Sequence, residues 1–221
     1  MSPMTETAGL ILAAGLSSRM GEFKPLLPLG KKTLIESSID SMLAAGVPRV
    51  TVVLGYRGEE VAALLRKGYD AKALSLAWNR NYAATDMLHS IRLGLRVLPS
   101  CEAFFLLPGD MPAVSPGTYR LEYKAWKKTG ARVVFPTLEG RRKHPPLIST
   151  ACVPDILRFS RPGGLRELWK EYEEAIVTIP VEDSGCRLDA DTREDYADLL
   201  RYLEQGKPPD NNQRHQTRRT V

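Results

Sequence analysis

The feature of this chain that most limits its fold is a regular alternation between short apolar runs and segments of helical period. Five apolar runs have the length of buried strands: residues 8–13, 49–54, 71–77, 103–107 and 132–135. The segments between them repeat apolar residues every three or four positions, which predicts helices at residues 33–45, 59–66, 86–97 and 115–128. In the third of these helices we expect Met87, Ile91 and Leu95 to point inward.

Strands that are apolar along their length and separated by helices predict a parallel sheet with both faces covered. We therefore expect an α/β fold with a single domain, three αβα layers and a mostly parallel, Rossmann-like sheet. After Pro136 the rhythm loosens, with helices expected at 151–159, 165–174 and 192–205, a strand at 174–181 and a basic loop at 140–146. In such sheets ligands bind beyond the carboxyl ends of the strands.

Length and charge agree with one globular unit. The chain has 221 residues, and a domain usually takes about 100–200. We expect this domain to occupy residues 1–205 and a disordered basic tail to occupy residues 206–221. The tail has four Lys and Arg residues against one Asp, so it supplies +3 of the net charge of +5. The rest of the chain is too evenly charged for a nucleic-acid reader.

The cysteines and the first residues bear on the compartment. Cys101, Cys152 and Cys186 lie far apart with no C-x-x-C pair, which argues against a disulfide framework and a zinc site and favours a reducing cytoplasm. The uncharged run at residues 8–16 is shorter than the roughly 20 residues of a membrane span. Residues 1–7 lack the basic start of a secretory signal, so we expect no membrane association.

The strongest local signal directly follows the first predicted strand. Small and hydroxyl residues there offer free amides and close backbone approach: Leu12, Ala13, Ala14, Gly15, Ser17 and Ser18. Arg19 and Lys24 add two cations to the same loop, and amides with cations form an anion cradle suited to a polyphosphate. The alternative is a glycine-rich connection with solvated charges. The position after a buried strand favours the cradle, although the loop is neither a Walker motif nor G-x-G-x-x-G.

This loop resembles the signature of GT-A-like nucleotidyltransferases, in particular the family that attaches a nucleotide to the molybdenum cofactor. That family reads L-A-[AG]-G-x-S-x-R-M-G-x-x-K-x-L-L, and the chain matches it at Leu12, Ala13, Gly15, Ser17, Arg19, Met20, Gly21, Lys24, Leu26 and Leu27. The resemblance implies that the loop holds a nucleoside triphosphate, with Arg19 and Lys24 on its phosphates. Further matches extend to about Tyr196.

Two acidic positions are candidates for a metal. Asp110 ends the fourth strand in P-G-D-M-P, where a carboxylate beside a phosphate cradle suits Mg²⁺. A turn aspartate is the alternative, and the family's metal-binding Asp in G-D-[MQ]-P favours the first interpretation. Asp191 in L-D-A-D-T-R-E-D-Y is typical of helix capping. The resemblance makes it a second ligand for the metal, whereas Asp189 and Asp195 are expected to be structural.

Two further segments resemble the family with departures. The basic loop at 140–146 lies on the side of the second substrate, which implies that His144 and Pro145 contact it, although Lys143 replaces a usual glycine. In the segment at 79–95 the resemblance assigns Asn79 and Ser90 to the nucleotide, while Asp86 replaces a glycine. Asp86 would repel phosphate or bind the amino group of a base. Gly55, after the second strand, is expected to give a backbone contact to the base.

The resemblance implies an enzyme that transfers a nucleotide to a phosphate and releases pyrophosphate. Its cytidylyltransferases tend to have L-A-A-G and its guanylyltransferases L-A-G-G, so Ala14 favours CTP, because its methyl group crowds a purine. One methyl group discriminates by only about 1–3 kcal/mol. The implied partners are CTP, a molybdopterin-type acceptor, Mg²⁺ and a molybdoenzyme as client.

Several alternatives stay open at this point. Within the class they are guanylyl transfer and transfer to a sugar or polyol phosphate. Outside it, a non-catalytic accessory protein could deliver cofactor and dispense with the metal, and Asp110 argues against that. An RNA-binding protein that uses the basic tail would lose its affinity without residues 206–221.

Overall fold

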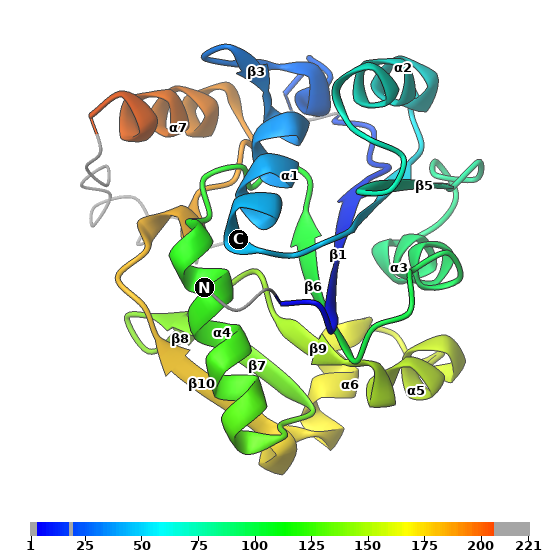
Figure 1. Ribbon diagram of the computed structural model, residues 1–221. Helices are drawn as coiled ribbons and strands as arrows, with labels where there is room; N and C mark the ends of the chain where they lie inside the picture. Colours follow the sequence, from blue (N-terminus) through cyan, green and yellow to red (C-terminus); the bar gives the residue numbers. More distant parts are fainter. Residues whose placement is uncertain (1–3, 18–19, 206–221) are drawn as a thin grey trace, which may run out of the picture.

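The central element of the structure is a twisted sheet that runs through the whole molecule (Figure 1). The computed structural model describes residues 4–17 and 20–205. The strands follow the order β10-β7-β9-β6-β1-β4-β5, and β8 pairs with β7. Their bounds are β1 (Thr7–Ala13), β4 (Val50–Leu54), β5 (Leu74–Trp78), β6 (Ala103–Pro108), β7 (Val133–Leu138), β8 (Arg141–Arg142), β9 (Leu147–Ser149) and β10 (Ile176–Pro180). A separate hairpin joins β2 (Pro28–Leu29) to β3 (Lys32–Thr33).

Strand direction confirms the mostly parallel sheet predicted from the sequence. β1 is parallel to both β4 and β6, β4 is parallel to β5, and β10 is parallel to β7. The exceptions are β8, which is antiparallel to β7, and β9, which lies between β6 and β7 and is antiparallel to both. β9 was not predicted, because it has three residues and directly follows two prolines.

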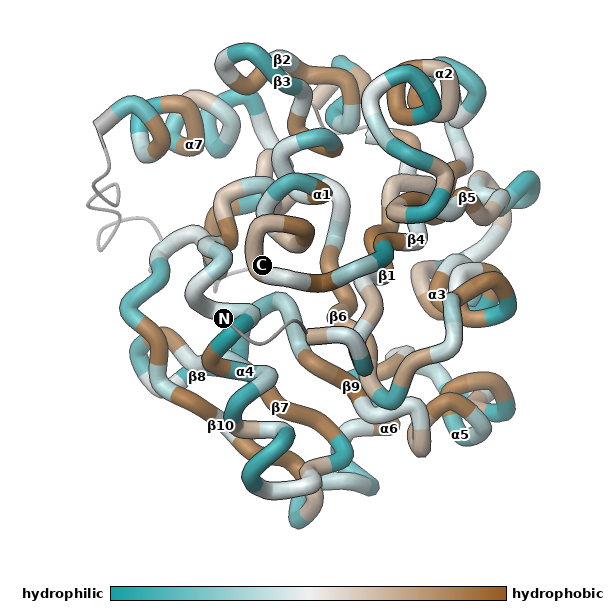
Figure 2. The backbone as a smooth tube through the Cα atoms, in the orientation of Figure 1, coloured by the Kyte–Doolittle hydropathy of each residue, from teal (hydrophilic) through white to brown (hydrophobic). Residues whose placement is uncertain are grey.

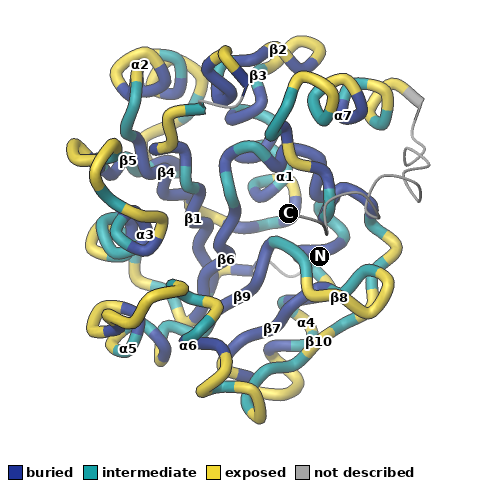
Figure 3. Tube along the Cα trace, turned by 180° about the vertical axis from the view of Figure 1, so that it is seen from behind, coloured by how far each residue is buried: buried dark blue, intermediate teal, exposed yellow. Residues whose placement is uncertain are grey.

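Helices cover both faces of the sheet, which confirms the three-layer expectation. One core lies between the sheet and α1 (Leu34–Ala45), α2 (Gly58–Gly68) and α4 (Pro116–Thr129). The other lies between the sheet and α3 (Met87–Leu95), α5 (Val153–Arg158) and α6 (Leu165–Glu171). Figure 2 shows the apolar strands at the centre, and Figure 3 shows the same strands buried when the molecule is seen from behind.

Local signals explain where several of these helices begin and end. Thr33 and Glu36 form a reciprocal capping box at the start of α1, and Gly46 in the left-handed conformation ends the helix. Ser115 caps α4 through the Gly117 amide, with Pro116 in its first turn. These devices fix the ends of α1 and α4, which pack against each other.

Two sequence expectations about helices need correction. Met87 was expected to point inward, but it is 60% exposed, since it is the first residue of α3 and lies at the lip of the site described below. The helix predicted at 151–159 is divided into a 3₁₀ turn, Thr150–Cys152, and α5. Pro154 near the start of α5 lacks a backbone N–H, so it suits a helix start better than a helix interior.

The C-terminal helix α7 (Arg193–Gln205) lies beside the β2–β3 hairpin (Figure 1). A small apolar cluster joins Leu199 of α7 to Leu29 of the hairpin and to Met20. Met20 belongs to the loop that matches the family signature, residues 12–27, which we call the signature loop. Among residues 4–17 and 20–205, the model contains no helix with the length and apolar character that a membrane crossing requires. The expected tail at 206–221 lies outside the described residues.

Candidate active site

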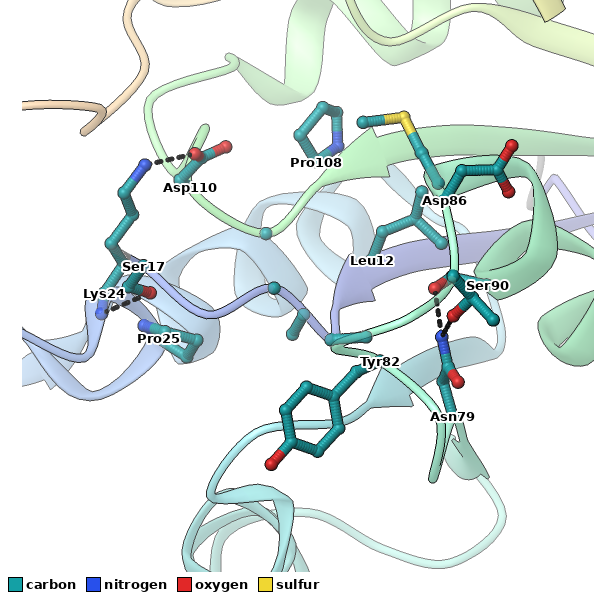
Figure 4. A pocket seen from close by; sticks show the side chains of 16 residues that line it. Leu12, Ser17, Lys24, Pro25, Asn79, Tyr82, Asp86, Ser90, Pro108 and Asp110 are labelled. Atoms are coloured by element: carbon teal, nitrogen blue, oxygen red, sulfur yellow. Dashed lines mark hydrogen bonds and ion pairs between the residues drawn. The ribbon is translucent and has the colours of Figure 1, made fainter. Parts of the chain in front are cut away.

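A cavity of about 260 Å³ opens at the carboxyl ends of β1 and β6 (Figure 4). It is the site that a parallel sheet of this kind predicts. Its lining comes from the signature loop, from the segment before α3 and from the end of β6: Leu12, Ala13, Ala14, Gly15, Ser17, Lys24, Pro25, Asn79, Tyr82, Thr85, Asp86, Met87, Ser90, Pro108, Gly109 and Asp110.

The signature loop folds back on itself at Ser17. Ser17 has a positive φ of 54°, and its hydroxyl accepts a hydrogen bond from the backbone N–H of Lys24 at 3.2 Å. This bond brings Lys24 to the loop's open side, beside the small residues Ala13 and Ala14. The loop thus presents a cation next to closely approachable backbone, as a phosphate cradle requires. Ser18 and Arg19, which were also assigned to the cradle, lie outside the described residues.

Lys24 makes the central polar contact of the site. Its ammonium donates hydrogen bonds to Asp110 Oδ2 at 3.0 Å and to Asp191 Oδ1 at 2.6 Å. Figure 4 shows the contact with Asp110 from within the cavity. Burial lowers the pKa of Lys24, but the hydrogen bond to Asp191 and the charge of Asp110 outweigh this effect, so that its pKa is raised overall. Lys24 is therefore charged at neutral pH and holds two carboxylates around one positive centre.

Two backbone hydrogen bonds fix the positions of these carboxylates. The N–H of Gly109 donates to Leu12 O at 2.9 Å, which ties the end of β6 to the end of β1. The N–H of Ala190 donates to Asp110 O at 3.0 Å, which ties the segment before α7 to the same place. Asp110 and Asp191 therefore come together because three separate stretches of chain are held at one edge of the sheet.

The other acidic residues near Asp191 have different surroundings. Asp195 forms a reciprocal capping box with Thr192 at the start of α7, which agrees with its expected structural role. Asp189 lies nearby without the ion pair to Lys24 that Asp110 and Asp191 make. Loss of hydration raises the pKa of Asp189 to about 6, and the negative charges of Asp110 and Asp191 contribute to this rise. This edge of the cavity thus has a surplus of negative charge, which favours cations.

The two carboxylates fit a divalent cation. Their oxygens already surround one cationic group, the Lys24 ammonium, at hydrogen-bond distance. Within residues 4–17 and 20–205, no group of three or more His, Cys, Asp or Glu side chains could hold a metal ion by itself. A pair of carboxylates completed by substrate phosphates and water is the usual arrangement for Mg²⁺.

Asn79 and Ser90 form a hydrogen-bonded wall of the cavity. Asn79 is 1% exposed, and its amide donates to Thr85 Oγ1 at 2.9 Å and to Ser90 Oγ at 3.0 Å (Figure 4). Its side-chain oxygen accepts from the N–H of Asn81 at 3.0 Å. The Asn79 side chain, which the sequence assigned to the nucleotide, therefore uses its hydrogen bonds to hold the 79–85 loop. Its direct effect is on the shape of the wall.

Two other expected positions find structural explanations. Asp86, the departure from the family pattern, caps α3 by accepting a hydrogen bond from the N–H of His89 at 2.9 Å. Gly55 does not line this cavity in the described part of the chain. A Cβ atom added to Gly55 would lie 2.4 Å from Ala14 O, so the glycine allows the β4–α2 turn to contact the signature loop.

A second cavity, of about 720 Å³, shares Asp86 and Met87 with the first. His144 lines it, whereas Pro145 is buried behind it. Burial lowers the pKa of His144 against the opposing effects of the Leu106 backbone and Asp110, so its imidazole is neutral at pH 7. Its Nδ1 is buried without a hydrogen-bond partner among the described residues.

This second cavity combines cations with an aromatic floor. Arg142, Lys143 and Arg166 lie around it, and Phe135 and Trp169 pack edge to face with ring centroids 6.3 Å apart. Arg142 donates hydrogen bonds to Glu173, which leaves Lys143 and Arg166 as the cations more available to a ligand. The sequence indicated the basic loop. Trp169 had no signal there, because its place depends on how α6 packs on the sheet.

Sequence reasoning also assigned no site role to Tyr82, Thr85 or Met87, all of which line the first cavity. Tyr82 and Met87 match the family pattern of the 79–95 segment, and this match was a usable signal for these two residues. Thr85 had none, because its role is to accept a hydrogen bond from Asn79 across a six-residue loop.

A cavity lined by small residues and Lys24 at the end of the first strand, with a pair of carboxylates beside it in a mostly parallel three-layer fold, is the arrangement expected of a nucleotidyltransferase. Comparison with known families agrees, since residues 9–176 match the model of the MobA-like NTP transferase domain. The chain belongs to this family.

Two solved structures and one curated protein show how far the similarity extends. The chain is 29% identical over 187 residues to the molybdenum cofactor cytidylyltransferase of Escherichia coli, covering 85% of this chain and 92% of that protein. A nucleotidyl transferase from Methanothermobacter thermautotroptrophicus has the same fold, with a TM-score of 0.77, 23% identity and coverage of 91% and 99%. Rv0371c of Mycobacterium tuberculosis, in a complex with manganese, has a TM-score of 0.66, 25% identity and coverage of 89% and 98%.

Proposed function

We propose that this enzyme transfers CMP from CTP to the phosphate of a molybdopterin-type acceptor, the molybdenum cofactor, with release of pyrophosphate. The observation that carries this proposal is the pair of adjoining cavities, one with a cation between two carboxylates and one lined by both cations and aromatic rings. The first suits a nucleoside triphosphate, and the second suits a phosphorylated molecule with a planar ring system. Similarity to the cytidylyltransferase of Escherichia coli over most of both chains supports the same assignment.

The chemistry requires positioning and charge compensation more than acid–base groups. An oxygen of the acceptor phosphate attacks the α-phosphorus in line, a new P–O bond forms, and the bond to the β-phosphate oxygen breaks. The attacking phosphate is already anionic, so no general base is needed. In this proposal Lys24 and Arg19 compensate the charge of the phosphates, and the backbone from Ala13 to Gly15 holds them in place.

Asp110 and Asp191 would hold the divalent cation, for which we propose Mg²⁺. Bound there, such an ion withdraws charge from phosphate oxygens and helps to orient the reacting groups. Without the ion the two carboxylates would repel phosphate, so the triphosphate would lie toward the signature loop and meet the acidic edge only through the bound cation. The structure of Rv0371c in complex with manganese supports the use of a divalent cation.

For the acceptor, we propose that the second cavity takes its ring system. Trp169 and Phe135 offer aromatic surface, and Lys143 and Arg166 offer cations for its phosphate and polar edges. The neutral imidazole of His144 lines the same cavity and offers the acceptor a polar surface without charge.

For the nucleotide, we propose that Ala14 favours cytosine. Ala14 is 6% exposed and lines the first cavity, with Gly55 directly behind it. Because Ala14 cannot retreat toward Gly55, its methyl group occupies space that a purine would need. Asn79, Ser90 and Thr85 fix the opposite wall.

The test is to supply the protein with Mg²⁺, the reduced molybdenum cofactor and each nucleoside triphosphate separately, and to measure pyrophosphate. We expect release with CTP, and we expect Ala14→Gly to shift the preference toward GTP by roughly tenfold. Pyrophosphate release by the unchanged protein with GTP alone would show that it transfers GMP and not CMP. Turnover only with a sugar or polyol phosphate would show that this phosphate is the acceptor. Nucleotide binding without turnover would indicate an accessory protein.

A further inference from the structure

The contact between Lys24 and the two aspartates has a consequence for how the metal enters. Lys24 was assigned to the phosphates of the nucleotide, yet its ammonium lies 3.0 Å from Asp110 and 2.6 Å from Asp191. These are the two residues that fit a divalent cation. Without a nucleotide, the enzyme therefore places a cation of its own between the carboxylates.

Lysine and metal cannot both keep this position. Both need the same carboxylate oxygens, and Mg²⁺ takes oxygen ligands at about 2.0–2.1 Å, closer than either ammonium contact. A second positive centre between the carboxylates would also repel the buried ammonium strongly, because like charges at contact distance interact strongly away from water. Lys24 is only 8% exposed, so water screens this repulsion poorly.

The structure also provides a second position for the ammonium. Lys24 has a long flexible side chain, and its backbone is held by the 3.2 Å hydrogen bond to Ser17 on the signature loop. The same side chain lines the cavity beside Ala13 and Gly15, where the phosphates are proposed to bind. A triphosphate in that cavity offers new anionic partners to Lys24, and a metal that arrives with it takes over the carboxylates.

We infer that Lys24 is a resident counter-cation of the metal site, which keeps Asp110 and Asp191 neutralised until a nucleotide draws it away, so that metal and nucleotide binding are coupled. This inference deepens the proposed function and rests on it for the identity of the site. It gives Lys24 a positioning role toward the aspartates besides its contact with phosphate. A lysine that served only the phosphates would leave metal affinity unchanged or would assist it.

The test measures Mn²⁺ binding to the nucleotide-free protein by electron paramagnetic resonance. We expect Lys24→Met to bind Mn²⁺ roughly tenfold more tightly than the unchanged protein, a typical size for coupled binding. Lys24→Arg, which keeps the charge, should retain weak binding. The control is Lys32→Met, because Lys32 is also ion-paired to an aspartate, Asp40 at 3.1 Å, but away from the site. It should leave Mn²⁺ affinity unchanged.

Further variants locate the bound ion. Adding Asp110→Asn to Lys24→Met should abolish the gain, whereas a gain that survives this change would place the ion elsewhere and overturn the inference. Equal or weaker Mn²⁺ binding by Lys24→Met would also overturn it. If Lys24→Met fails to fold, Lys24→Gln keeps a polar side chain of similar length and serves the same comparison.

The measurement is independent of the reaction. It uses neither CTP nor the acceptor, so an enzyme that turned out to transfer another nucleotide would still be expected to show the gain. Conversely, the unchanged protein could turn over CTP while Lys24→Met shows no gain in Mn²⁺ affinity. That result would leave the proposed function in place and contradict the counter-cation role of Lys24. A larger rise in thermal stability on adding Mn²⁺ to Lys24→Met than to the unchanged protein would support the inference by a second readout.

Discussion

Three aspartates lie within seven residues of each other before and at the start of α7, and their surroundings divide their roles. Asp191 is 2.6 Å from the Lys24 ammonium, Asp189 lies beside this ion pair without joining it, and Asp195 caps the helix through Thr192. The local sequence favoured capping for Asp191, and the structure assigns that role to Thr192 and Asp195 instead. The contact between Asp191 and Lys24, in contrast, joins residues 167 positions apart.

This division predicts unequal effects of two closely matched changes. We expect Asp191→Asn to lower kcat roughly a hundredfold, because it removes charge that acts directly at the reacting centre. Asp189→Asn should lower it less than about tenfold, since Asp189 makes no ion pair with Lys24 among the described residues. Steady-state pyrophosphate release measures both, with thermal unfolding as a check on the fold. Equal losses of kcat in the two variants would show that Asp191 contributes no more to catalysis than Asp189.

At the scale of elements, the position of the signature loop depends on the turn between β4 and α2. Gly55 in that turn packs against the backbone of Ala14, where a Cβ atom would lie 2.4 Å from the carbonyl oxygen. The added Cβ atom and the carbonyl oxygen of Ala14 are both attached to the backbone, so neither can move aside as a flexible side chain would. The β4–α2 turn thereby fixes the position of the signature loop relative to the end of β1.

We therefore expect Gly55→Ala to destabilise the protein by about 1–3 kcal/mol, the usual cost of overpacking, and to raise the KM for the nucleotide. The matched control is Gly68→Ala at the other end of α2, where the added Cβ would make an ordinary 3.8 Å contact with Glu36. That change should be neutral or stabilising by up to about 1 kcal/mol, because alanine favours helix. Denaturant unfolding and nucleotide titration measure both effects. A neutral Gly55→Ala would show that the turn does not support the loop.

The elements that sequence could predict are those with a strong local pattern. The apolar run at 103–107 is continuous and ends at Pro108–Gly109, and the structure places β6 at Ala103–Pro108. Likewise the small and basic residues of the loop after β1 indicated a phosphate site because they directly follow a buried strand. The lining of the first cavity by Ala13, Ala14 and Lys24 agrees with that prediction.

The parts that sequence could not predict depend on distant contacts. β9 has three residues, and it is a strand only because β6 and β7 lie on either side of it. The inward position expected for Met87 was wrong, because periodicity cannot tell that a helix begins at the lip of a cavity. Lys24, Asp110 and Asp191 were each identified as site residues, but their mutual contact spans 86 and 167 positions and has no local signal.

At the scale of the whole molecule, one buried carboxyl group lies outside the proposed site. Glu122 on α4 is 0% exposed, and neither of its carboxyl oxygens has a hydrogen-bond partner among the described residues. Burial raises the pKa of Glu122 well above its ordinary value, and the backbone of Leu147 opposes this only in part. Its titratable neighbours Tyr119 and Cys186 also have raised pKa values because they are buried, so both are neutral at pH 7. Tyrosine and cysteine side chains are either neutral or anionic, so neither neighbour can supply a positive charge to compensate an ionised Glu122.

This arrangement predicts how stability depends on pH. In the unfolded chain Glu122 ionises near its ordinary pKa of 4.5, whereas in the folded protein it keeps its proton to a much higher pH. Between these two values the folded state binds more protons, so the contribution of Glu122 to the free energy of unfolding falls as pH rises. The fall is at most about 1.4 kcal/mol per pH unit. Glutamine does not titrate, so Glu122→Gln should remove this part of the slope.

The measurement is denaturant unfolding of both proteins at several pH values between about 5 and 8, where this slope is expected. Subtracting one curve from the other cancels the carboxyl groups that the two proteins share, so the difference isolates Glu122. We expect Glu122→Gln to gain stability relative to the unchanged protein as pH rises. Glu182→Gln, at an exposed position, should show no such trend. A difference that stayed constant with pH would mean that Glu122 ionises alike in both states, which its lack of exposure and of hydrogen-bond partners among the described residues opposes.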